Sequence, residues 1–151
     1  MRLLLRSALV ASMCLGGIAM PAFADEPAVY TSWRDNIALG GYDAMSFHDG
    51  VPLEGDPQYY FSYMGAVFYF ASQDSRNRFI SEPERYAPAY GGYCAWAVSK
   101  GKLAPGDPEQ WSVKDGRLYI NFNKRIKKRW DRRANKFIDS ADKKWPDILE
   151  D

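Results

Sequence analysis

The 151-residue sequence contains a single histidine, His48, and this scarcity limits the chemistry that the chain can support. A metal site built from several histidines is excluded, and a Ser-His-Asp triad would have to use this one imidazole ring. His48 lies in the segment Phe47-His48-Asp49-Gly50, whose composition is typical of a turn. We therefore interpret His48 first as an exposed turn residue.

The sequence also lacks an apolar run of the roughly 20 residues that a transmembrane helix needs. The stretch from Leu9 to Met20 is shorter and contains two glycines; it follows Arg2 and Arg6 and precedes the pattern Ala22-Phe23-Ala24. This arrangement is typical of a secretory signal peptide. We predict cleavage of residues 1–24, one domain over residues 25–151 with its core at 37–146, no transmembrane segment after cleavage, and a periplasmic or secreted location.

Cysteine is almost as scarce as histidine. Cys14 belongs to the predicted signal, which leaves Cys94 as the one cysteine of the mature chain and excludes an internal disulfide. In an oxidising compartment a lone thiol is buried, metal-bound, reactive or paired between chains. The glycines and aromatic residues around Cys94 favour burial as a small apolar side chain. A reactive dyad with His48 and ligation of a soft metal are the alternatives.

A strong net charge of either sign is missing as well. Without residues 1–24 the chain has 18 basic and 19 acidic residues, and this balance gives no indication of a nucleic-acid partner. The charge is unevenly distributed, because residues 25–113 carry a net −6 and residues 114–151 a net +5. The run of basic residues from Lys124 to Lys136 is interpreted as the solvated face of a helix, or as a surface for anionic lipid or polyanion.

What the sequence has in plenty is aromatic residues, and their pattern predicts two hairpins. The segment Tyr59 to Ala71 is rich in residues that favour strands and has Met64-Gly65 where it can turn. Between Trp111 and Asn121, Asp115-Gly116 separates two apolar runs. Most of the aromatic side chains must fill the core, and a few on the surface could stack on a flat ligand. Two further segments, Ile37 to Phe47 and Tyr90 to Val98, are predicted to contain short strands.

Helices are predicted between and after these hairpins. Ser72 is a candidate N-cap for a helix over residues 73–80, and Ser81-Glu82-Pro83-Glu84 resembles a capping box that opens a second short helix. Between Lys124 and Trp145, apolar residues at helical spacing predict an amphipathic segment, with a bend allowed near residue 134. The expected fold is α+β: a small antiparallel sheet of hairpins, two short helices and a longer C-terminal amphipathic helical segment.

The segment Tyr69 to Phe79, with the lead-in from Tyr63 to Phe68, resembles the YHS-domain family. Metal-associated members of that family carry the pattern YFCSxxCxxxF at this spacing. The segment Gly40-Gly41-Tyr42-Asp43-Ala44 and the downstream Pro83, Tyr86, Pro88 and YGGYCA extend the resemblance over residues 37–146. The chain is therefore similar to the exported, single-domain branch of the family.

The resemblance fails at the residues that would bind metal. Ala71 and Ser75 occupy the positions of the two cysteines, and Tyr59-Tyr60-Phe61 stands where the Tyr-His-Ser triplet would fall. The family's ligands are thus absent, and any metal site must be built around Cys94. His48, Met45 and Met64 are the other side chains that could help to bind copper or zinc.

Three functions remain open after this reasoning. The first is an exported, non-enzymatic YHS-like binding module that handles copper or another soft metal through Cys94. The second is a thiol-dependent enzyme or redox protein that uses Cys94 with His48. The third is an aromatic-rich domain that binds a ligand or a protein partner whose identity the sequence does not give.

Overall fold

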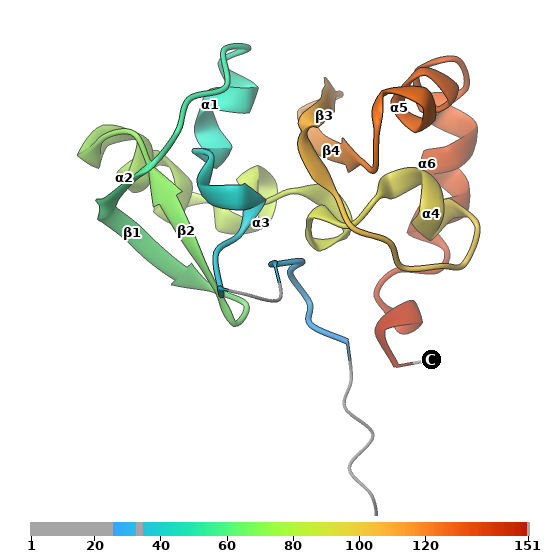
Figure 1. Cartoon of the computed structure of the whole chain (residues 1–151), viewed down its shortest axis with the longest axis horizontal. Coiled ribbons are helices and arrows are strands. Elements are labelled where there is room, and N and C mark those ends of the chain that lie inside the picture. Colours follow the sequence, from blue (N-terminus) through green and yellow to red (C-terminus); the bar gives the residue numbers. More distant parts are fainter. Residues whose placement is uncertain (1–25, 33–34, 151) are drawn as a thin grey trace, which may run out of the picture.

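In the computed structural model, which describes residues 26–32 and 35–150, a hairpin anchors each half of the chain (Figure 1). The hairpins join β1 (Asp56–Tyr63) to β2 (Ala66–Phe70) and β3 (Asp107–Lys114) to β4 (Arg117–Asn121). Their two-residue turns are the predicted Met64-Gly65 and Asp115-Gly116. All four turn residues have positive φ, which matches the twist of the flanking strands. Both predicted hairpins are therefore confirmed.

Helices pack around each hairpin, so the predicted α+β class is also confirmed. The first half contains α1 (Ala44–His48), α2 (Gln73–Ser81) and α3 (Pro83–Tyr86), and the second half contains α4 (Ala95–Ser99), α5 (Lys124–Asp131) and α6 (Ala134–Asp142). Single 3₁₀ turns lie at Leu39–Gly41, Ala89–Gly92 and Asp147–Leu149. The hairpins form two separate two-stranded sheets in place of the single small sheet that we expected.

The segment Ile37 to Phe47, predicted as two short strands, instead forms a 3₁₀ turn followed by α1. The cause is Asp43, whose carboxylate accepts a hydrogen bond from the Met45 amide and thereby caps the helix. The helix buries Ala44, Met45 and Phe47 between α2 and the two hairpins, and the Phe47 ring packs on Trp111 of β3. A short apolar run fits a buried helix as well as a strand, so periodicity alone could not decide.

The segment Tyr90 to Val98 was likewise predicted to run into a strand and instead enters α4. The N-terminus of α4 is capped by a residue that is distant in the sequence. The Oδ1 atom of Asn121, the last residue of β4, accepts a hydrogen bond from the Trp96 amide at 3.2 Å. Gly91 allows the backbone at Ala28 to approach closely, since a Cβ atom at position 91 would lie 1.9 Å from the Ala28 carbonyl oxygen.

The start of α2 is as predicted, whereas the start of α3 is not. The Ser72 hydroxyl accepts a hydrogen bond from the Ser75 amide and caps α2. The predicted capping box at residues 81–84 does not form, because the Ser81 hydroxyl donates to the Arg78 carbonyl and Glu82 makes no side-chain cap. Pro83 in the first turn, which has no N–H to satisfy, still permits the helix to begin there.

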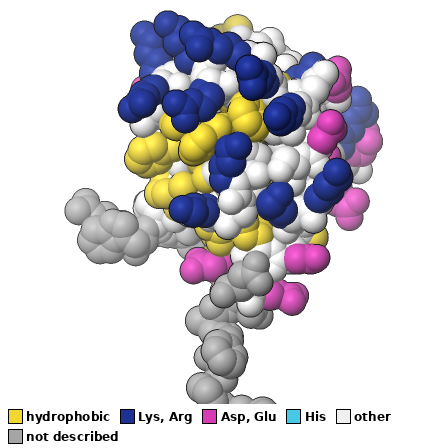
Figure 2. Space-filling model, turned by 90° about the vertical axis from the view of Figure 1, so that its right-hand side faces the viewer, with side chains coloured by type: hydrophobic (Ala, Val, Ile, Leu, Met, Phe, Trp, Pro, Cys, Tyr) yellow, Lys and Arg dark blue, Asp and Glu magenta, His cyan; other side chains and the backbone are white. Residues whose placement is uncertain are grey.

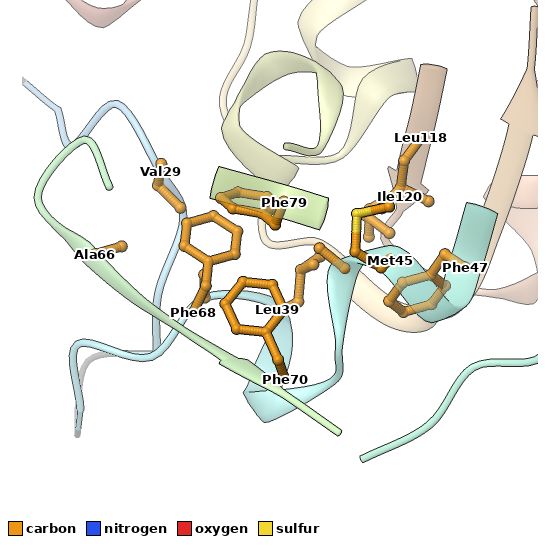
Figure 3. Packing of buried hydrophobic residues seen from close by; sticks show 12 residues of the cluster. Val29, Leu39, Met45, Phe47, Ala66, Phe68, Phe70, Phe79, Leu118 and Ile120 are labelled. Carbon is orange, nitrogen blue, oxygen red and sulfur yellow. The ribbon is translucent and has the colours of Figure 1, made fainter. Parts of the chain in front are cut away.

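Two apolar clusters fill the interior, and β4 contributes to both. Phe68, Phe70 and Phe79 pack together in the first half, where Figure 3 shows Met45 beside Ile120 of β4. The neighbouring side chains of β4 alternate, so Tyr119 faces the second cluster and packs on Trp130. Alternation along one strand thus joins the two halves of the molecule.

The C-terminal segment forms two helices with the bend near residue 134 that the pattern allowed. Trp130 is 1% exposed and Phe137 is buried beside it, as predicted for the apolar face. Ile126, Ile138 and Trp145 are partly buried. Over the described residues, no helix is both long and apolar enough to cross a membrane. The predicted signal peptide lies outside the described residues.

Candidate functional site

Cys94 lies at the junction of α4 and β4 and is 1% exposed. Its backbone bridges to Ile120, and its thiol lies 3.8 Å from the Asn121 side-chain oxygen. Burial raises the pKa of the Cys94 thiol, because a thiolate would lose its hydration. Nearby backbone groups partly oppose this shift without reversing it. The thiol is therefore protonated at neutral pH.

His48 is half-buried at the end of α1, and its neighbours are on α3. Its Nε2 atom lies 3.3 Å from the Tyr86 carbonyl oxygen, and its ring meets the Tyr86 ring edge to face. Burial lowers the pKa of His48, and the hydrogen bond to Tyr86 and the charge of Asp49 only partly offset this effect. Within the described part of the chain, no hydrogen bond joins His48 to Cys94.

The two methionines singled out in the sequence lie in different environments. Met45 is fully buried in the first apolar cluster, whereas Met64 is 55% exposed at the tip of the first hairpin. No group of three or more His, Cys, Asp and Glu side chains in the described ranges is arranged to hold a metal ion. The metal site proposed from Cys94, His48, Met45 and Met64 stays a prediction.

Asp43 is a buried carboxylate that sequence reasoning did not single out. It is 1% exposed and accepts hydrogen bonds from the amides of Met45 and Ala71, at 2.8 and 2.9 Å, and from the Ser75 hydroxyl. These bonds tie α1 to the junction between β2 and α2. The sequence feature that could have indicated this role is the position of Asp43 directly before the apolar run that begins at Ala44, because aspartate at such a position is a good helix N-cap.

A cleft of about 220 Å³ lies between the two halves of the molecule. Aromatic side chains from three distant parts of the chain, Tyr63, Tyr90 and Trp145, line it together with Met64 and the N-terminal segment at Ala28. Glu84, Arg85 and Arg117 supply the charged groups of the wall. Apolar rings with a few polar groups are the composition of small-molecule sites in proteins, although this cleft is smaller than most.

A hydrogen-bonded network fixes one wall of this cleft. Arg117 donates to both carboxylate oxygens of Asp142 at 3.1 Å, and the Tyr90 hydroxyl donates to the same carboxylate at 2.7 Å. Burial acts to raise the pKa of Asp142, but these donors outweigh it, so the pKa is lowered and the group stays ionised. Burial also raises the pKa of Tyr90, which keeps its phenol protonated.

The fold and this cleft define a two-lobed α+β domain. Residues 44–90 match the family model of the YHS domain. The matched segment runs from α1 through the first hairpin to Tyr90, so Cys94 and the second hairpin lie outside it. Searches of curated proteins and of solved structures gave no significant match.

Asp43, the residue that directly precedes the matched segment, binds two residues within it, Ala71 and Ser75. The Ala71 amide and the Ser75 hydroxyl both donate hydrogen bonds to the Asp43 carboxylate. The backbone of one and the hydroxyl of the other are thus committed to a carboxylate. A structural hydrogen-bond network occupies this part of the domain.

Proposed function

We propose that the protein is an exported, non-enzymatic binding module of the YHS type that holds a small planar ligand in the cleft between its halves. The observation that carries the proposal is the convergence of Tyr63, Tyr90 and Trp145 on one cleft. Such rings stack on flat apolar or aromatic groups with little loss of side-chain entropy.

The polar groups of the cleft indicate the chemistry of the ligand. The carboxylate of Asp142 is already neutralised by Arg117. Arg85 lies at the rim with its side chain 60% exposed, and its ion pair with Glu82 at 3.4 Å is exposed to solvent and therefore weak enough for a ligand to compete with. A planar ring that carries one carboxylate would place the ring against the aromatic wall and its charge near Arg85. Benzoate is therefore a suitable probe.

Benzoate titration followed by nuclear magnetic resonance tests this proposal. We expect benzoate to shift the indole N–H signal of Trp145, which is assigned by its loss in Trp145→Phe, because the ring current of a stacked ligand acts at short range. The signals of Trp96 and Trp111, which do not line the cleft, should stay in place.

A matched pair of arginine variants locates the binding. Arg85→Gln removes the cation at the rim and should weaken benzoate binding severalfold, whereas Arg76→Gln on α2 removes an equal charge away from the cleft. Unchanged Trp145 signals at millimolar benzoate, or equal losses in both variants, would contradict a cleft that binds planar anions.

Soft-metal handling is a second candidate, favoured by the YHS-domain match and by the free thiol of Cys94. It predicts that reduced protein binds about one Cu(I) and that Cys94→Ser abolishes this binding. Because metal must displace the proton of a thiol whose pKa is raised, affinity should fall as pH decreases. A titration that shows no uptake at micromolar Cu(I) refutes it. The use of Cys94 with His48 as a thiol enzyme stays an untested alternative.

A further inference from the structure

The second half of the molecule carries a basic surface on α5, the following turn and the start of α6. Seven exposed side chains form this surface, here called the basic face: Lys124, Arg125, Lys128, Arg129, Arg132, Arg133 and Lys136. None of them forms a salt bridge with any residue that the structure describes, whereas their neighbour Lys127 pairs with Asp131 at 2.7 Å. The basic face is therefore an uncompensated concentration of positive charge.

Two of these cations lie where positive charge is unfavourable for the helix itself. Lys124 and Arg125 occupy the first turn of α5, which contains no acidic residue, although the N-terminus of a helix already carries partial positive charge. Five members of the basic face line one open hollow with no other residue type in its wall: Lys124, Arg125, Lys128, Arg129 and Arg132. Like charges placed this close together repel, and binding of an anionic surface would relieve that repulsion.

Apolar side chains are exposed next to the same charges. Phe122, 48% exposed, directly precedes the N-cap Asn123 of α5, and Val113, 37% exposed, lines an adjoining hollow with Arg132 and Arg133. Figure 2 shows Lys and Arg side chains gathered over the upper part of this side of the molecule, with hydrophobic side chains beside and below them and acidic ones toward the lower and right edges. Charge and exposed apolar surface occur together, as in proteins that lie on membranes.

We propose that the basic face docks the protein on the surface of an anionic phospholipid membrane. The cations of α5 would contact lipid phosphates while Phe122 and Val113 enter the headgroup region. The charge distribution supports this orientation, because every member of the basic face belongs to residues 114–151, which carry a net +5, whereas the net −6 of the chain lies in residues 25–113. This inference does not depend on a ligand in the cleft.

Vesicle co-sedimentation of the protein as purified from the cells that make it tests the proposal. We expect binding to phosphatidylcholine vesicles that contain phosphatidylglycerol, little binding to phosphatidylcholine alone, and progressive release as salt screens the charges. The double variant Lys128→Gln/Arg132→Gln should bind roughly thirtyfold more weakly, since each basic residue near the surface contributes about a factor of five.

The double variant Arg76→Gln/Lys102→Gln is the matched control, because it removes the same charge from outside the basic face. Its affinity for the vesicles should stay within about threefold of the wild-type value. That small loss is the long-range effect of the lower net charge. Thermal unfolding of both variants shows whether either has lost its fold. The proposal is overturned if both double variants lose the same vesicle affinity, or if binding does not depend on the phosphatidylglycerol content of the vesicles. Capture by heparin without any binding to vesicles also overturns it and assigns the basic face to a soluble polyanion.

Discussion

Replacement of Trp130 by alanine is expected to lower the free energy of unfolding by about 3 to 5 kcal/mol, the usual cost of deleting a buried aromatic side chain. Trp130 is 1% exposed, and its ring centroid lies 5.2 Å from that of Tyr119 and 5.9 Å from that of Phe137. The variant therefore loses the contact of α5 with β4 and the contact of α5 with α6 together. Equilibrium unfolding in urea, followed by circular dichroism, measures the change.

Lys128→Gln is the matched control for Trp130→Ala on the same helix. Lys128 is exposed and forms no salt bridge with a described residue, so its replacement should change stability by less than about 0.5 kcal/mol. A Trp130→Ala variant as stable as Lys128→Gln would show that α5 is not a core element. The comparison thus separates the buried face of α5 from its charged face.

The C-terminal helices and both hairpins could be predicted because their signals are local. Asp115-Gly116 specifies a two-residue turn by itself, and the apolar residues of α5 and α6 repeat at helical spacing whatever they contact. The same holds for Ser72, whose capping bond spans three residues. Local sequence was sufficient wherever the stabilising contact is also local.

The errors occur where the deciding contact is distant in the sequence. Helix α4 is capped by Asn121, 25 residues further along the chain, and no pattern around Cys94 indicates it. The cleft combines Tyr63, Tyr90 and Trp145, which meet only because the two hairpins pack as they do. Candidate ligands chosen by residue type, such as Met45 and Met64, consequently proved to lie in unlike environments.

Asp43→Ala is expected to destabilise the protein by about 3 kcal/mol, because it leaves the buried Met45 amide and the part-buried Ala71 amide without an acceptor. The wild-type carboxylate accepts from the amides of Met45 and Ala71 and from the Ser75 hydroxyl, so it connects α1 with the β2–α2 junction. The Met45 amide cannot turn to water, since it lies in the buried first turn of α1 beside the 1% exposed Asp43. Urea unfolding measures the loss, and hydrogen exchange at Met45 and Ala71 reports whether the two amides lose protection.

Two companion variants distinguish the hydrogen-bond network from a general effect of removing aspartate. Asp49→Ala breaks a bidentate ion pair with Arg78. Both partners are about half exposed, so the free energy of unfolding should fall by less than about 1 kcal/mol. Ser75→Ala removes one donor yet leaves both amides bonded to Asp43, and we expect about 1 kcal/mol. The predicted order of destabilisation is therefore Asp43→Ala far above Ser75→Ala and Asp49→Ala. If Asp43→Ala instead unfolds at the same urea concentration as Asp49→Ala, the buried carboxylate does not hold α1 against the β2–α2 junction.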